Sequence, residues 1–219
     1  MKRRELVAFD VKAGLPTAIR TLKAELGTRR ALRVLASFVR RSLGRDPLKS
    51  IPRPPVSQWS ADDEWLSRHQ YRPVVILDDV LRDLLGLDVE QRVEVLRAVI
   101  SASGARFLAA NVSIPEAQDW EAADDDGRKA TVAGMVERFF NARVDKLHTS
   151  GTRAGFDVNA CRFAEISVAL GREYLAPLFC AADSAYFGTG ASPVRLERTE
   201  TIATGGSCCD FRFGWNAID

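Results

Sequence analysis

Apolar residues recur every three or four positions in the first 50 residues, which is the spacing of an amphipathic helix. Two groups show this spacing: Leu15, Ile19, Leu22 and Leu26, then Leu32, Leu35, Val39 and Leu43. Gly27 and Gly44 follow the two groups and are expected to end the helices. Residues 45–65 contain four prolines and predict an extended linker, anchored on the surface by Trp59 and Trp65.

The middle of the chain also predicts helices. Residues 72–112 contain apolar runs that predict two helices joined near Gly86–Asp88. Asp88 and Gln91 have the spacing of a capping box, which marks the start of the second helix. The acidic residues 115–127 are expected to form a surface loop, and residues 127–147 to form another amphipathic helix.

The pattern changes after Gly151. Alternating apolar and polar residues predict a strand over 153–161, and helical spacing predicts a helix over 162–171. Residues 173–187 continue as a helix that Pro177 is expected to kink or end early.

The last part of the chain predicts a two-stranded hairpin over residues 193–215, with its turn near Gly205–Gly206. Helices followed by mixed strands and helices indicate an α+β fold. We expect a helical region, residues 1–147, to pack on a C-terminal module with an antiparallel sheet, residues 148–219.

The sequence GGSCCDFRF, residues 205–213, places two cysteines side by side on the second hairpin strand. Because side chains alternate along a strand, Cys209, Phe211 and Phe213 share one face, and the phenylalanines make it the core face. Cys208 and Asp210 lie on the opposite face. Cys209 is then a buried apolar group or a thiol in a pocket wall, although both cysteines can also be purely structural.

The first hairpin strand places Arg198 and Glu200 on an otherwise apolar face. Two charges on a core face are costly unless they are paired or face a cavity. One explanation is a bulge that turns them outward. The other is a polar pocket floor in which Arg198 holds a substrate carboxylate.

The net charge of +2 makes nucleic acid an unexpected partner, although residues 1–50 contain thirteen Lys and Arg against four acidic residues. We expect no membrane span and no secretory signal, because apolar runs of the required length are missing. Four cysteines in 219 residues do not form a disulfide framework, so reduced thiols in the cytoplasm are expected.

Cys161 is the candidate nucleophile, because it stands where a strand meets a helix and the helix N-terminus is expected to lower its thiol pKa. Cys180 is expected late in its helix, where the helix dipole disfavours a thiolate. Glu165 and Asp183 are candidates for proton transfer. His69 and His148 have no motif around them, so a Ser–His–Asp triad has no support.

A metal site is the alternative use of the cysteines. Cys161, Cys180 and Cys208 or Cys209 could bind zinc, with Asp183 or Asp210 as the fourth ligand. The chain has no pair of cysteines two residues apart, so only the fold could bring these ligands together. We therefore expect no cofactor, with zinc as the alternative.

Residues 156–213 resemble the L-2-amino-thiazoline-4-carboxylic acid hydrolase family. The resemblance rests on VNAC before a helix, LFCAAD after it, and the closing hairpin RTET…GGSCCDFRF. The segments RPVVILDDVLRDLLG and MVERFFNA are similar to the helical half of such proteins. The resemblance implies hydrolytic opening of a thiazoline ring at its amidine-like carbon, giving a carbamoyl-cysteine.

The same region more remotely resembles the V4R small-molecule-binding domain, which implies an antiparallel sheet under helices. Zinc-binding members of that class use E-x-x-C-x7-C on the closing hairpin and an earlier cysteine. The matching hairpin positions here are Arg198, Thr201 and Cys209, and the earlier cysteine is Cys161. Arg198 and Thr201 do not match the zinc ligands at their positions, so two of the four zinc-ligand positions are lost.

Together, residues and resemblance predict a hydrolase acting on a small cyclic C–N substrate of the thiazoline carboxylate type. Cys161 is the predicted nucleophile, Glu165 or Asp183 the proton shuttle and Arg198 the carboxylate anchor. The pocket is expected to include Cys180, Glu200, Cys208, Cys209 and Asp210. The alternative is a non-catalytic module that binds a small molecule or a metal, and a homodimer is left open.

Overall fold

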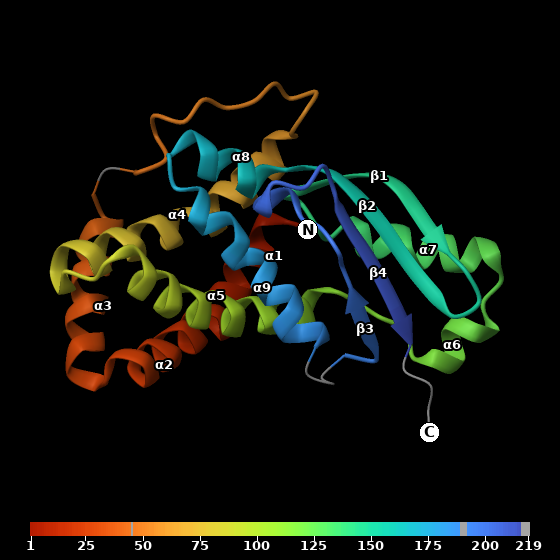
Figure 1. Cartoon of the computed structure of the whole chain (residues 1–219), viewed down its shortest axis with the longest axis horizontal. Coiled ribbons are helices and arrows are strands. Elements are labelled where there is room, and N and C mark those ends of the chain that lie inside the picture. The colour runs from red at the N-terminus through yellow and green to blue at the C-terminus, as the bar shows by residue number, and fades with distance from the viewer. Residues whose placement is uncertain (45, 189–191, 216–219) are drawn as a thin grey trace.

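The computed structural model describes residues 1–44, 46–188 and 192–215. The N-terminal half is helical, and the C-terminal part contains a four-stranded antiparallel sheet (Figure 1), which confirms the predicted α+β fold. The α-helices are α1 (Arg3–Phe9), α2 (Leu15–Leu26), α3 (Thr28–Ser42), α4 (Ala61–Leu85), α5 (Val89–Asn111), α6 (Ala117–Ala122), α7 (Asp125–Val136), α8 (Arg162–Ala169) and α9 (Ala176–Phe187).

The strands follow the order β1-β2-β4-β3 across the sheet, and each neighbouring pair is antiparallel. Their bounds are β1 (Ala142–Thr149), β2 (Arg153–Cys161), β3 (Val194–Glu197) and β4 (Cys209–Trp215). Three short elements complete the fold: the π-helix η1 (Asp10–Gly14) and the 3-10 helices η2 (Glu173–Leu175) and η3 (Ile202–Thr204).

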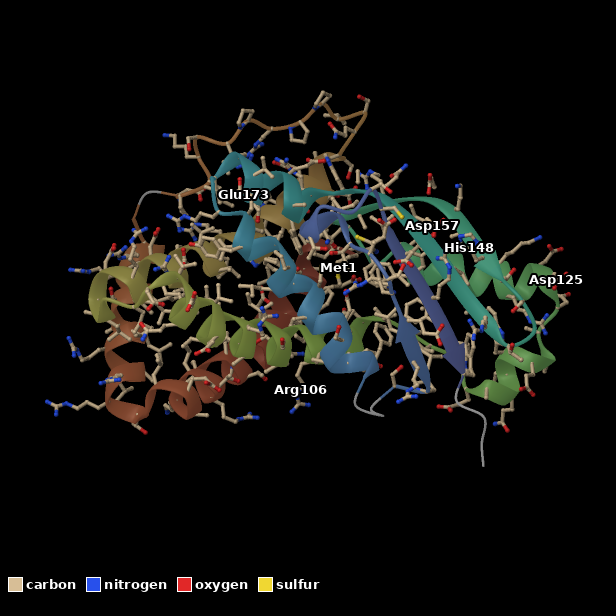
Figure 2. The ribbon with its side chains drawn as sticks, viewed as in Figure 1. Met1, Arg106, Asp125, His148, Asp157 and Glu173 are labelled. Atoms are coloured by element: carbon tan, nitrogen blue, oxygen red, sulfur yellow. The ribbon has the colours of Figure 1, made fainter. Side chains whose placement is uncertain are left out.

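The inner face of the sheet has the predicted composition. Cys209, Phe211 and Phe213 of β4 are buried, whereas Cys208 and Asp210 are partly exposed. Aromatic stacking across the strands, with ring centroids of Phe156 and Phe211 4.8 Å apart, fills this face. The opposite face is polar: His148 and Asp157 lie side by side there (Figure 2), with 3.0 Å between Nε2 and Oδ2.

Strand β1 is the main element that the pattern along the chain missed. The helix predicted over 127–147 ends at Val136, and Ala142–Thr149 pairs with β2 instead. Antiparallel pairing with β2, the next strand along the chain, overrides the local helical pattern, because β-structure depends on cross-strand packing. The predicted domain boundary at 147/148 falls within β1 and stays a prediction.

Several element limits also differ from those predicted. The acidic stretch is partly helical, because α6 and the start of α7 lie in it. The linker is shorter, since Ser60 caps α4 and the helix begins at Ala61. Pro177 starts α9 rather than interrupting it, so Cys180 lies early in that helix and not late. The capping box of Asp88 and Gln91 is present as predicted.

Helix α5 packs closely on α9, and a glycine permits the contact. A Cβ atom at Gly104 would lie 2.4 Å from the Cβ atom of Ala182, which is closer than two side chains can approach. The contact sets the distance between the two helices next to Asp183.

Two buried carboxylates of α4 connect the helical half to the C-terminal part. Glu64 accepts hydrogen bonds from Arg68 and from Arg162 of α8, the latter from Nε at 2.6 Å. These bonds outweigh the opposing effect of burial and keep the pKa of Glu64 below its ordinary value. The carboxyl group of Glu64 therefore stays ionised at neutral pH although it is buried.

Asp78 forms the second connection and is fully buried. Its carboxylate accepts hydrogen bonds from Arg92 at 2.7 Å, Arg172 at 2.9 Å and Tyr174 at 2.7 Å. Because Arg172 and Tyr174 follow α8, the network holds α4, α5 and the segment before α9 together.

The Asp78→Ala variant should lose about 3–5 kcal/mol of unfolding free energy, because it leaves the buried guanidinium group of Arg92 without its carboxylate partner. Urea denaturation followed by circular dichroism measures the loss. Asp83→Ala, on the same helix but with an exposed ion pair to Arg82, is the matched control and should lose at most about 1 kcal/mol. Equal losses in the two variants would contradict the role given to Asp78.

Candidate functional site

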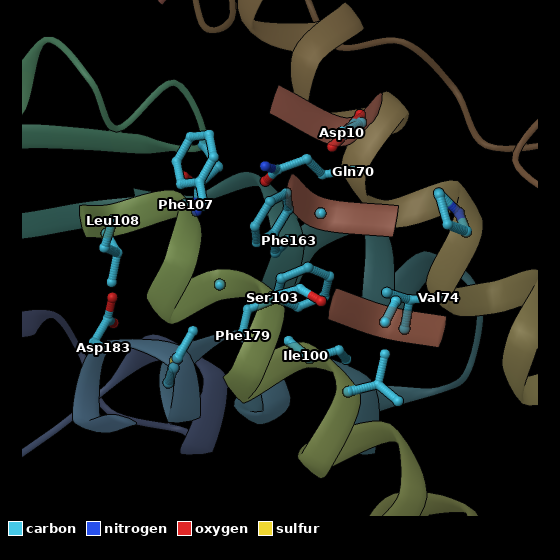
Figure 3. A pocket seen from close by; sticks show the side chains of 18 of the residues that line it. Asp10, Gln70, Val74, Ile100, Ser103, Phe107, Leu108, Phe163, Phe179 and Asp183 are labelled. Carbon is cyan, nitrogen blue, oxygen red and sulfur yellow. The ribbon is translucent and has the colours of Figure 1, made fainter. Parts of the chain in front are cut away.

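A cavity of about 450 Å³ lies between the helical half and the inner face of the sheet. Side chains from α2, α4, α5, α8, α9 and β4 line it, and Figure 3 shows part of its wall. The wall is mainly aliphatic and aromatic; Leu22, Val74, Leu96, Ile100, Phe107, Phe163 and Phe179 belong to it. A concave apolar space with a few polar groups is the usual form of a small-molecule site.

Five of the nine predicted site residues line this cavity: Cys161, Cys180, Asp183, Arg198 and Cys209. They come from the end of β2, from α9, from the segment after β3 and from the start of β4. Residues up to 48 positions apart in the sequence therefore share one wall, as the strand–helix–hairpin order suggested.

Cys161 ends β2 and is the N-cap of α8, as predicted. Its thiol pKa is not lowered, however: burial raises it to about 11. The backbone N–H groups of Ala164 and Phe163 oppose the rise but do not cancel it. The expected effect of the helix N-terminus is therefore smaller than the cost of burying a thiolate, and Cys161 is a neutral thiol near pH 7.

The other two cavity cysteines are also neutral thiols. Burial, and then the negative charge of Asp183, raises the pKa of Cys180 to about 12. Burial raises the pKa of Cys209, whose Sγ accepts a hydrogen bond from the backbone N–H of Ile202 at 3.3 Å.

Asp183 and Arg198 form an ion pair whose two members both line the cavity. Arg198 Nη1 donates to Asp183 Oδ2 at 2.8 Å, and Arg198 Nη2 donates to the Cys180 carbonyl at 3.2 Å. The guanidinium carbon lies 4.9 Å from the centroid of the Phe211 ring, a cation–π contact. Arg198 is thus paired and faces a cavity, rather than turned outward by a bulge.

The protonation of Asp183 is set by two opposing effects. Burial raises its pKa, the positive charge and hydrogen bond of Arg198 lower it, and the result is a pKa of about 6. A carboxyl group with a pKa near neutral pH can both accept and return a proton, which is the property of a general acid–base group.

Glu165 lies outside the cavity wall, as far as the described residues define that wall. Its carboxylate accepts hydrogen bonds from Trp59 Nε1 at 3.1 Å and from Arg162 Nη1 at 2.9 Å. It therefore fastens the linker to α8, and Trp59 is the anchor that the sequence predicted. Trp65 is partly buried and stacks on His69.

Glu200 and Cys208 lie in the connection between β3 and β4, and Glu200 contacts both Cys208 and Asp210, the second residue of β4. All three lie away from the cavity wall formed by the described residues. Cys208 Sγ donates to Glu200 Oε1 at 2.8 Å, and this bond raises the thiol pKa to about 11. Asp210 is partly buried, but hydrogen bonds from the Thr199 hydroxyl and backbone keep its pKa below the ordinary value. These hydrogen bonds stabilise the conformation of the connection between β3 and β4.

The zinc alternative receives no geometric support. Over residues 1–44, 46–188 and 192–215, no three or more His, Cys, Asp or Glu side chains lie where they could hold one metal ion. Cys161, Cys180 and Cys209 share the cavity wall but are not such a set.

The cavity also contains polar residues that the sequence did not indicate. Asp10 of η1 and His69 of α4 lie in its wall, with 2.8 Å between Oδ2 and Nε2. Ser103 of α5 lines it too, and its buried hydroxyl has no hydrogen-bond partner. No sequence motif marks these residues as part of a cavity, because Ser103 and Asp10 lie in segments whose hydrophobic pattern indicates only an amphipathic helix.

Fold and cavity together define an α+β protein with a concave, mainly apolar cavity, a form that is typical of small-molecule sites. Comparison with protein-family models matches residues 90–213 to the L-2-amino-thiazoline-4-carboxylic acid hydrolase family. The match covers more than half of the chain and includes all five predicted residues of the cavity wall, so the chain belongs to this family. Searches of curated proteins and of solved structures gave no match.

The sequence predicted no membrane-spanning segment. Among the helices of the described residues, not one is both long and apolar enough to span a bilayer.

Iodoacetamide should react slowly with Cys161, Cys180 and Cys208 at pH 7.5, roughly 300- to 3000-fold slower than with free cysteine of pKa about 8.5, because only the thiolate reacts. Their pKa values of about 11 to 12 leave almost no thiolate at that pH. Peptide mass spectrometry against time measures each rate.

Glu200→Gln should accelerate alkylation of Cys208 alone, because it removes the charge that raises this pKa. Glu197→Gln, an exposed neighbour paired with Arg153, is the matched control. A fast reaction of Cys161 in the unmodified protein would contradict the neutral thiol described above.

Proposed function

We propose that the protein opens the ring of a small thiazoline carboxylate by hydrolysis at the end of the cavity where Asp183, Arg198 and Cys161 lie. Membership of the hydrolase family supports the reaction class. The single observation that carries the choice of residues is the Asp183–Arg198 pair in the wall of a mainly apolar cavity. It supplies a proton carrier and an anion-binding group side by side.

Arg198 is suited to bind the substrate carboxylate. A guanidinium group has five N–H donors, and in this chain two of its nitrogens donate one hydrogen bond each, to Asp183 and to Cys180. Donors therefore remain for a carboxylate, which guanidinium groups bind in a fixed geometry. Such binding orients the ring with its reacting carbon beside Asp183.

Asp183 is suited to move protons during the reaction. The carboxylate takes a proton from water as the water oxygen bonds to the amidine carbon, and passes that proton to the ring nitrogen. It then takes the proton of the new hydroxyl group and passes it to sulfur as the carbon–sulfur bond breaks. The ring carbon becomes the carbonyl of a carbamoyl group, and one water is consumed.

The carbon–sulfur bond is the one expected to break, because a thiolate is a better leaving group than an amide nitrogen. The carbon–nitrogen bonds of the cyclic amidine are then retained in the carbamoyl product. The substrate class is the one predicted from the sequence. The proposal adds which bond of the ring breaks, namely the carbon–sulfur bond.

Cys161 as the nucleophile is the competing route. It needs Asp183 or the substrate to remove the thiol proton first, because burial raises the thiol pKa to about 11. Attack by water also passes a proton to Asp183, but it forms no covalent intermediate that a second water must open, so we assign the attack to water.

The value of kcat/KM should fall about tenfold per pH unit below pH 6, because Asp183 acts as a base only when ionised. Its pKa of about 6 places the loss there: the carboxylate form dominates above pH 6 and disappears below it. Initial rates of ring opening between pH 4.5 and 8, followed by release of a free thiol, measure the profile.

Asp183→Asn should lower kcat by about 10²–10⁴-fold and remove this pH dependence. Asp126→Asn, at an exposed position of α7, is the control and should keep the full profile. Binding of the substrate without turnover in the unmodified protein would instead favour the non-catalytic binding module.

Cys161→Ala should retain kcat within about tenfold if water attacks, whereas removal of a covalent nucleophile would cost several powers of ten. Single-turnover rates and mass spectrometry of the intact protein during turnover make the comparison. A stable mass increase on Cys161, or a total loss of activity in a folded Cys161→Ala protein, would overturn attack by water.

A further inference from the structure

The cavity is larger than a thiazoline carboxylate. An apolar cavity of about 150 Å³ accommodates one benzene ring, so 450 Å³ corresponds to roughly 18 non-hydrogen atoms. A bare amino-thiazoline carboxylate has only about nine, counted on the same basis as the six of benzene. About half of the space would stay empty around it.

The excess space is mainly apolar and lies away from the Asp183–Arg198 pair, although Asp10 and His69 also belong to the cavity wall. Figure 3 shows Asp183 at one side of the pocket and Val74 at the other, with Ile100, Ser103, Phe163 and Phe179 between them. Val74 and Ile100 belong to α4 and α5, whereas Asp183 belongs to α9. The charged end and the apolar end therefore lie on different helices.

Ser103 adds a second, independent observation. Its hydroxyl is buried in the cavity wall without a hydrogen-bond partner, although a buried hydroxyl normally has one. A ligand atom that accepts or donates one hydrogen bond would satisfy it, at a point between the charged end and the apolar end.

We infer that the substrate of this site is amphiphilic: a thiazoline carboxylate-type head with an apolar extension of roughly nine atoms that has one polar atom near Ser103. The inference rests on the proposed function for the head. The extension is inferred from the size of the cavity, its apolar wall and the unpartnered hydroxyl. It identifies a substrate class for which the bare ring is only the reacting part.

Synthetic thiazoline carboxylates with none, four or eight carbons on the exocyclic nitrogen test the extension. The value of kcat/KM should rise with each methylene, by up to about fourfold, because each one moves from water into the apolar end. Hydrolysis of the bare ring with no gain, or a loss, for the longer compounds would overturn the inference and leave the proposed function intact.

Calorimetric binding of the same compounds separates the two proposals. Affinity that increases with chain length without any ring opening would support the ligand class and contradict hydrolysis. An eight-carbon compound with an internal amide should lose affinity in Ser103→Ala, whereas the plain eight-carbon compound should not. Equal losses for both compounds would contradict the role of the Ser103 hydroxyl.

Ala18 lies in the cavity wall on α2, so Ala18→Phe should fill part of the apolar end. Affinity for the eight-carbon compound should fall at least tenfold, while the bare ring is hydrolysed as before. Ala24→Phe, at an exposed position of the same helix, is the matched control and should change neither. If circular dichroism finds Ala18→Phe unfolded, Ala18→Leu repeats the test, and unchanged affinity in a folded variant would overturn the inference.

Discussion

Burial of two carboxylates on α4 constrains the whole structure. A charge in an apolar interior is tolerated only with partners in good geometry, so Glu64 and Asp78 must meet their arginines wherever α4 packs. Arg162 is the first residue of α8, and Arg172 follows this helix. Because both arginines pair with carboxylates of α4, helix α4 fixes the position of both ends of the segment after β2. Cys161, which directly precedes Arg162, is thereby held in the cavity wall.

The apolar cavity wall then determines the chemistry of the groups in it. Burial acts in the same direction on every acid, favouring the neutral form, but its consequence differs between a thiol and a carboxyl group. The pKa of Cys161 moves to about 11, away from neutral pH, whereas that of Asp183 moves to about 6, towards it. One environment thus keeps the expected nucleophile neutral and brings the pKa of Asp183 into the range that the proposed proton transfer requires.

The sequence predicted those features that depend on neighbouring residues. Alternation identified Cys209 and Phe211 as inward-facing, and the capping box at Asp88 marked the start of a helix. Strand β1 was missed because its residues continue the helical spacing of α7, and only pairing with β2 makes them a strand. Glu165 was assigned to the pocket because helical spacing does not say which neighbour a side chain meets. The cavity could not be predicted, since residues that line a hollow and residues that fill a core have the same apolar pattern.

The contact of Gly104 with Ala182 links sequence variation to the geometry of the reacting end. A methyl group at position 104 would force α9 away from α5, and Asp183 would move with its neighbour. Positions 104 and 182 are therefore expected to covary among relatives, a larger side chain at one being compensated by glycine at the other. Selection on catalysis would then act on a residue that takes part in no chemical step.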